Sequence, residues 1–145
     1  MASRALSVVI RRPIAEVFDY MNDVTREHEW QPHLVDAVQE PPGPSAVGSL
    51  RRYRSEFMGR SVENTYVIRA WEPRRRLTLE TTGDSALEAT SEVRWEAVPD
   101  GTRVMMTVEG KPKGAFRLVP RKLLEATMHK ETEAALARLK ERLER

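Results

Sequence analysis

The chain contains no cysteine and only three histidines among its 145 residues, and both shortages restrict its chemistry. Without cysteine there is no disulfide, no thiolate nucleophile and no thiolate metal site. His28, His33 and His129 lack the spacing of any common metal-ligand motif, so we expect no metal site. The sequence also has no glycine-rich phosphate loop and no GxSxG motif, which argues against kinases and serine hydrolases, and we expect no cofactor.

Long apolar runs and a large net charge are missing as well. No segment approaches the roughly 20 apolar residues of a membrane span, and the short N-terminal apolar stretch, closed by Arg11 and Arg12, does not resemble a signal peptide. We therefore predict a cytoplasmic protein without integral membrane association. The 24 Lys and Arg are interleaved with 22 Asp and Glu, which argues against a nucleic-acid partner. The basic run 74–76 is interpreted as a solvated turn, with an anion or RNA contact as the alternative.

The N-terminal part of the chain predicts a strand followed by two short helices. Residues 6–10 alternate in polarity, as a strand does, and residues 13–21 place apolar side chains three and four positions apart on one helix face. Asn22 and Asp23 offer a break and a cap for a second short helical turn, which extends to about Trp30.

The rest of the chain predicts a meander and a long closing helix within a single domain of residues 1–145. Residues 34–40 predict a second strand, and four or five further alternating segments follow from Ser49, each bounded by turn residues. After Gly110 the period changes to 3.6, and a helix of about 24 residues follows Pro120. The apolar stripe expected in the whole stretch after Gly110 consists of Phe116, Leu123, Leu124, Met128, Ala135, Leu136, Leu139 and Leu143.

Several short sequence segments together resemble those of the START-like superfamily, in particular its bacterial polyketide cyclase/dehydratase members. These are PIAEVF at 13–18 with the Asn-Asp pair and Trp30 that follow, then Val47-Gly48, Glu72-Pro73 and DGTRV at 100–104. The resemblance covers essentially the full chain. It implies an α+β helix-grip fold, in which a curved seven-stranded antiparallel sheet wraps around the long C-terminal helix and encloses a hydrophobic cavity. It does not imply one chemistry, because members include carriers, sensors, cyclases and coenzyme-Q-binding proteins.

Strand alternation and the helix stripe give a set of inward-facing residues that either fill the core or line this cavity. We assign no catalytic residue among them. The candidate cavity-lining residues are Phe18, Trp30, Tyr53, Ser55, Phe57, Asn64, Tyr66, Ile68, Leu79, Ser91, Val93, Trp95, Met106, Phe116, Leu124, Met128 and Glu131.

The polar members of this set are the most informative about function. Tyr53, Asn64 and Ser91 lie on inward strand faces, where they bond one another, hold water or contact a ligand. Glu131 lies at the flank of the helix stripe. It is either exposed or leans inward, where it would meet the cavity or pair with an arginine such as Arg51, and a desolvated carboxyl there would be a plausible acid or base.

Three functions are compatible with these patterns. The first is binding of a small hydrophobic molecule (polyketide, lipid or quinone-like) by a carrier, sensor or sequestering protein, and the second is a polyketide cyclase/dehydratase using the same cavity. The third is a partner-binding module of the coenzyme-Q- or ribosome-associated kind, which predicts an exposed apolar patch and a basic surface. We expect a monomer or homodimer, with an entrance between the segments 40–48 and 111–120.

Overall fold

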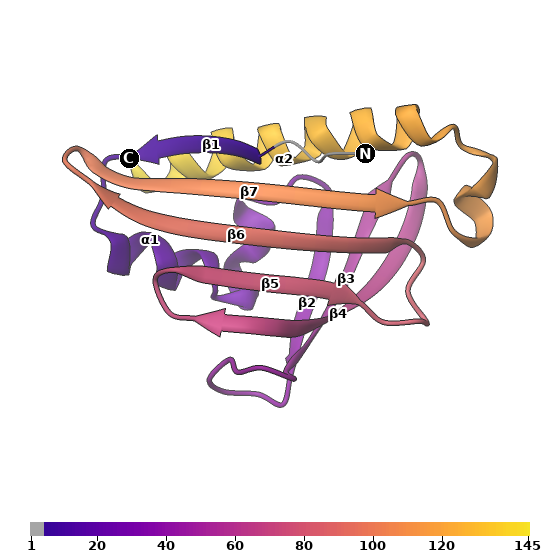
Figure 1. Ribbon diagram of the computed structural model, residues 1–145, viewed down its shortest axis with the longest axis horizontal. Helices are drawn as coiled ribbons and strands as arrows, with labels where there is room; N and C mark the ends of the chain where they lie inside the picture. Colours follow the sequence, from indigo (N-terminus) through magenta and orange to yellow (C-terminus); the bar gives the residue numbers. More distant parts are fainter. Residues whose placement is uncertain (1–4) are drawn as a thin grey trace.

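The computed structural model describes residues 5–145 and contains a seven-stranded antiparallel sheet in the order β1-β7-β6-β5-β4-β3-β2 (Figure 1). Two short helices, α1 (Ile14–Met21) and the 3₁₀ helix η1 (Val24–Glu29), follow the first strand, and the 3₁₀ helix η2 (Gly114–Leu118) precedes the long helix α2 (Arg121–Leu143). The expected helix-grip architecture is confirmed. The strands are β1 (Ala5–Ile10), β2 (Leu34–Glu40), β3 (Leu50–Phe57), β4 (Arg60–Glu72), β5 (Arg76–Thr81), β6 (Glu88–Val98) and β7 (Gly101–Lys111).

The sheet is strongly curved, and its curvature creates the concave face that holds the site. Figure 1 shows β2 and β3 running across the direction of β6 and β7. Two shifts in strand register, between Leu34 and Asp36 in β2 and between Ile68 and Ala70 in β4, interrupt the ladders. Such bulges increase the local twist and bend a sheet, so the strands β2–β4 fold towards the helices.

Helix α1 closes one end of the curved sheet. Pro13 precedes it, and the helix buries Val17, Phe18 and Met21, the face that the sequence spacing predicted. The Phe18 ring meets Trp95 of β6 edge-to-face, with 4.8 Å between the ring centroids. This packing fixes α1, and the chain that follows it, against the concave face of the sheet.

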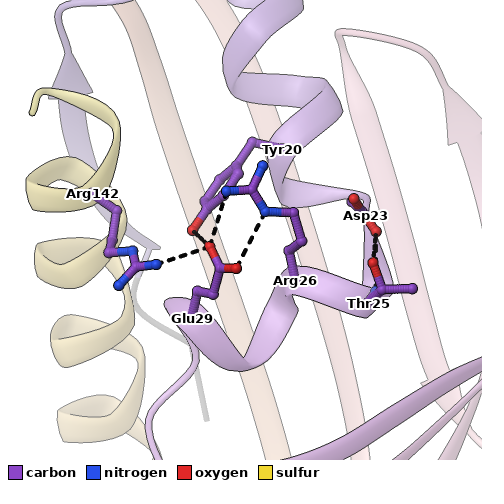
Figure 2. Close-up of polar contacts among 6 residues, drawn as sticks. All are labelled: Tyr20, Asp23, Thr25, Arg26, Glu29 and Arg142. Carbon is purple, nitrogen blue, oxygen red and sulfur yellow. Dashed lines mark hydrogen bonds and ion pairs between the residues drawn. The ribbon is translucent and has the colours of Figure 1, made fainter.

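A polar cluster at Glu29 ties η1 to both α1 and α2. Figure 2 shows the Glu29 carboxylate between Tyr20, Arg26 and Arg142. Arg26 and the Tyr20 hydroxyl donate hydrogen bonds to it, and Arg142 donates from the last turn of α2 at 3.0 Å. These donors favour the charged carboxylate and lower the pKa of Glu29 to about 2. The cluster therefore holds η1 in one orientation near neutral pH.

Helix α2 packs against β7 and β1 and covers the open side of the curved sheet. Its buried residues lie on one stripe: Leu124, Thr132, Ala135, Leu136 and Leu139. The expectation that Leu123 belongs to this stripe is wrong, because its side chain is 50% exposed. Leu123 lies one position, or about 100° of helix rotation, from Leu124 and points away from the core. Within the described residues, no helix has the length and apolar character needed to cross a membrane.

Helix α2 approaches the sheet tightly at Gly110 of β7. A Cβ atom at this position would lie 2.5 Å from Sδ of Met128 on α2. We expect Gly110→Ala to displace the flexible end of Met128 and to cost about 1 kcal/mol of unfolding free energy, the lower end for overpacking. Gly83→Ala is the matched control, since no atom lies within 4 Å of its added Cβ. Urea unfolding compares the two, and equal stabilities would contradict the close packing.

Candidate ligand-binding site

A cavity of about 210 Å³ lies between the concave face of the sheet and α2. Strands β3 to β7 supply most of its walls, and the connection after η1 and the middle of α2 supply the rest. Its apolar lining consists of Pro32, Leu34, Phe57, Val62, Leu79, Leu87, Met106, Val108 and Met128. Its polar lining consists of Glu27, Gln31, Tyr53, Ser55, Glu56, Asn64, Tyr66, Ser91, Glu131 and Thr132. Apolar walls with a few convergent polar groups are typical of small-molecule sites.

A larger depression of about 940 Å³ lies over the ends of β6 and β7 and the first half of α2. Its rim is mostly exposed and charged, with Glu88, Lys111, Arg121, Lys122 and Lys130 among its residues. Charged groups in open water gain little from a ligand, because solvent screens them. We place the candidate site in the smaller cavity, where desolvated polar groups face apolar walls.

The structure brings ten of the seventeen candidate residues together in the cavity lining. They are Tyr53, Ser55, Phe57, Asn64, Tyr66, Leu79, Ser91, Met106, Met128 and Glu131. The other seven are absent from the lining and pack in the two core clusters. Phe18, Trp30, Ile68, Val93 and Trp95 belong to the cluster under α1, whereas Phe116 and Leu124 belong to the cluster at the other end of the sheet.

Glu27 is the most unusual group of the cavity, and it is not among the residues predicted from the sequence. It lies on η1 and is only 5% exposed. The Tyr53 hydroxyl donates a hydrogen bond to its Oε1 at 3.0 Å. Burial disfavours the charged carboxylate and raises the pKa of Glu27 to about 7, although Arg51, Tyr53 and Gln31 all act in the opposite direction. The cavity wall therefore contains a carboxyl group that exchanges its proton near neutral pH.

Arg51 lies behind the polar end of the cavity and is 2% exposed. Its guanidinium donates hydrogen bonds to Gln39 at 3.1 Å, to Asn22 at 3.2 Å and to Ser45 at 3.1 Å. Within the described residues, no carboxylate lies within 4.0 Å of it. Neutral dipoles thus hold a buried cation in place, and its charge acts on Glu27 from a distance. An ion pair between Arg51 and Glu131 was one of the alternatives that the sequence left open, and the structure does not place these two residues side by side.

Two tyrosines complete the polar end of the cavity. Tyr53 and Tyr66 lie on neighbouring strands, with their ring centroids 5.6 Å apart in an edge-to-face arrangement. Burial, together with the nearby Glu27, raises the pKa of Tyr66 to about 12 and that of Tyr53 well above its ordinary value. Both hydroxyls therefore keep their protons at physiological pH. The Tyr53 hydroxyl donates its hydrogen bond to Glu27, and the Tyr66 hydroxyl remains available as a hydrogen-bond donor.

Asn64 and Ser91 add further polar groups to the lining, and Asn64 is the partner of Tyr53 in the β3–β4 ladder. Asn64 Oδ1 accepts a hydrogen bond from the backbone N–H of Leu87 at 3.1 Å, so the amide is anchored in the turn before β6. That bond leaves the donor end of the Asn64 amide for other partners. Ser91 lies opposite Leu79 and Val108 on the adjacent strands, which places a hydroxyl in an otherwise apolar stretch of the lining.

Glu131 lies where α2 borders the cavity. Its side chain is 32% exposed, and the Glu131 carboxylate lies 3.5 Å from Nε2 of His33, which follows Pro32 in the cavity wall. Partial burial raises the pKa of Glu131, while the nearby His33 lowers it. The Glu131 carboxyl group is thus intermediate between the two alternatives that its position on the helix left open, which were full exposure and an inward orientation.

The expected entrance does not match the cavity lining. Neither segment 40–48 nor segment 111–120 contributes a lining residue. The second segment packs beside the lining, where the Phe116 ring lies 5.8 Å from that of Phe57. The partly exposed lining residues include Gln31, Pro32, Glu56 and Glu131, so the cavity opens between the connection after η1, the end of β3 and α2.

Solved structures with the same fold come from several bacteria. A Thermus thermophilus protein is 17% identical with a TM-score of 0.81, covering 98% of this chain and 97% of that one. The aromatase/cyclase Zhui from Streptomyces sp. R1128 is 16% identical with a TM-score of 0.79, covering 99% and 94%. A START superfamily protein from Mycobacterium smegmatis is 14% identical with a TM-score of 0.79, covering 98% and 97%. These identities establish a shared fold and no more.

Comparison with curated proteins finds no significant match. The sequence profile of one family, in contrast, matches residues 1–144, almost the entire chain. That family is described as "Polyketide cyclase / dehydrase and lipid transport". The match agrees with the curved sheet, the long closing helix and the cavity between them. The chain belongs to the polyketide cyclase/dehydrase and lipid transport family.

Proposed function

We propose that the protein binds a small, mainly hydrophobic molecule with a hydrogen-bonding end in the cavity between the sheet and α2. The observation that carries this proposal is the division of the cavity into an apolar body and a polar end, where Glu27 and Tyr53 meet. An apolar ligand body gains from leaving water. A hydroxyl or carbonyl group at its end finds partners at Glu27, the tyrosine hydroxyls or the Asn64 amide.

The cavity volume limits the size of the enclosed part of the ligand. An internal apolar cavity of about 150 Å³ is large enough for benzene. A volume of about 210 Å³ therefore suits a molecule, or part of one, with one or two rings. A quinone ring or the first ring of a polyketide has this size. A longer chain would extend through the opening beside Glu131.

The proposal is tested directly by a substitution that fills the cavity with a larger side chain and so competes with a bound probe. Isothermal titration calorimetry with 2-naphthol, a hydroxylated two-ring probe, should detect binding to the unchanged protein. We expect Ser91→Leu to weaken it at least about tenfold, equivalent to roughly 1.4 kcal/mol, because leucine occupies the space of the probe. Thr90→Leu is the matched control, since Thr90 is the preceding residue and faces solvent. Equal affinities for the two variants would place the probe outside the cavity.

Glu27 favours a second function, proton-transfer catalysis on the bound molecule. Aldol-type cyclisation and dehydration need a group that removes a proton beside a carbonyl and returns it to a leaving oxygen. A general acid–base works best with a pKa near the working pH, and that of Glu27 is about 7. The aromatase/cyclase among the structural neighbours supports this reading. An enzyme should lose turnover far more than affinity in Glu27→Gln, whereas a carrier should show only a change in affinity.

A further inference from the structure

The segment between β7 and α2 combines exposed apolar side chains with unbalanced positive charge. We define the β7–α2 segment as residues 110–124, GKPKGAFRLVPRKLL, which contain five Lys and Arg and no Asp or Glu. The complete chain has a net charge of only +2, so the rest of it is net negative. The charge is therefore concentrated in one short stretch of an otherwise balanced chain.

The apolar side chains of this segment divide between core and solvent. Phe116 and Leu124 are buried and hold the segment against the sheet. Leu118, at the end of η2, is 95% exposed, and Leu123, in the first turn of α2, is 50% exposed. A leucine that is almost completely exposed gains nothing from the fold of this protein. The buried pair thus anchors a surface from which Leu118 and Leu123 project.

A third exposed apolar side chain lies beside this surface. Phe57 ends β3, and its ring is 5.8 Å from that of Phe116 in η2. The next residue, Met58, is at the tip of the turn between β3 and β4 and is 36% exposed. The ring contact therefore brings the β3–β4 turn next to η2. Figure 1 shows this turn at the same end of the molecule as η2 and the start of α2.

Some cations of the segment already have an interaction partner within the protein, and others have none. Arg121 pairs with Glu125 at 3.1 Å, and the Lys113 ammonium donates a hydrogen bond to the carbonyl oxygen of Gly83. Lys111, Arg117 and Lys122 form no ion pair with any residue of the described chain. These three are exposed and flank Leu118 in sequence on both sides. Their charges are available for an external anion.

We propose that the β7–α2 segment docks the protein onto the surface of an anionic lipid membrane. Exposed leucines between cations match the two components of such a surface, since apolar side chains enter the acyl boundary while Lys and Arg remain at the anionic headgroups. A protein partner with an acidic groove would also attract the cations, but it would need a shaped pocket for Leu118. This docking is separate from the proposed ligand binding and does not depend on it.

Vesicle co-sedimentation tests the docking without any ligand. Vesicles of phosphatidylcholine with roughly one third phosphatidylglycerol should bind the protein at about 0.1 M salt, and vesicles of phosphatidylcholine alone should bind it at least tenfold more weakly. We expect Arg117→Gln/Lys122→Gln to weaken binding about 30-fold, from the usual contribution of two cations near an anionic surface. Leu118→Ser should weaken it about tenfold, the lower end for burying a leucine.

Two control variants distinguish binding through this surface from a general attraction of the protein to vesicles. Arg74→Gln/Arg75→Gln removes the same charge from another exposed turn, and Val47→Ser removes an apolar side chain that is 65% exposed elsewhere. Both should bind anionic vesicles like the unchanged protein. Absence of vesicle binding, or equal losses in the control and test variants, would overturn the proposal. The proposal would also be overturned if the protein bound single-stranded RNA in a salt-sensitive way and did not bind vesicles, since the surface would then be a nucleic-acid site.

Discussion

Replacing Arg51 with methionine is expected to lower the free energy of unfolding by about 2–4 kcal/mol, because two hydrogen-bond acceptors lose their donor inside the protein. Methionine fills much of the same space but donates no hydrogen bond. The side-chain oxygens of Asn22 and Ser45 then lose their donor inside the protein, whereas that of Gln39 keeps the hydrogen bond from the Ser45 hydroxyl. Each unsatisfied buried group costs roughly 1–3 kcal/mol, so relief from burying a cation offsets only part of the total.

Arg52→Met is the matched control for this experiment. Arg52 is the next residue of β3, and it points to the outer face, where its side chain is 48% exposed and pairs with Glu40. An exposed ion pair contributes about 0–1 kcal/mol, so this variant should unfold close to the unchanged protein. Urea unfolding of both variants gives the comparison. Similar losses from the two substitutions would show that the buried network around Arg51 contributes little to stability.

The second large effect is the pH dependence that Glu27 imposes on stability. In the unfolded chain this carboxyl has an ordinary pKa of 4.5, whereas burial raises the pKa to about 7 in the folded protein. Between these two values the folded state retains a proton that the unfolded state has released. Stability contributed by this group is therefore present below about pH 4.5 and is lost as the pH rises through about 7. The difference amounts to about 3 kcal/mol.

Glu27→Gln removes this titration while keeping an acceptor for the Tyr53 hydroxyl. At pH 5 the variant and the unchanged protein should have similar stabilities, and at pH 8 the variant should be the more stable by about 3 kcal/mol. Thermal unfolding at a series of pH values measures the difference. A difference that stays constant between pH 5 and pH 8 would contradict a raised pKa of Glu27.

Tyr53→Phe provides an independent check of the same titration. The Tyr53 hydroxyl donates its hydrogen bond to Glu27, and this bond lowers the pKa of the carboxyl. Without the hydroxyl, the midpoint of the pH-dependent loss should move to higher pH. A midpoint that moves to lower pH would show that another group is responsible for the titration.

Local patterns in the sequence were sufficient to predict most of the elements. The predicted strand 34–40 has the bounds of β2, and the predicted helix after Pro120 corresponds to α2. Alternation and helical spacing depend on neighbours within a few positions, so a single sequence contains them. The same parity placed Tyr53, Asn64 and Ser91 on the concave face, and the structure has all three in the cavity lining.

The charged residues of the site were harder to predict, because charged side chains are normally exposed. Arg51 has the inward parity of Tyr53, yet only its partners from three other parts of the chain permit its burial. Glu27 and Trp30 are three positions apart, which places them on one face of a 3₁₀ helix. That spacing was the available signal for Glu27. The contact between Glu131 and His33 joins distant segments, so no local pattern contains it.

The order of the strands has a consequence for how the protein is made. Among the strands of residues 5–145, β1 pairs with β7 alone, and Ala5 lies opposite Thr107. During synthesis at roughly 5–20 residues per second, β1 therefore leaves the ribosome several seconds before its only neighbour in the sheet exists. Throughout that interval Leu6, Val8 and Ile10 present an unpaired apolar strand to the cell. The apolar strand can therefore associate with other chains until β7 emerges and covers it.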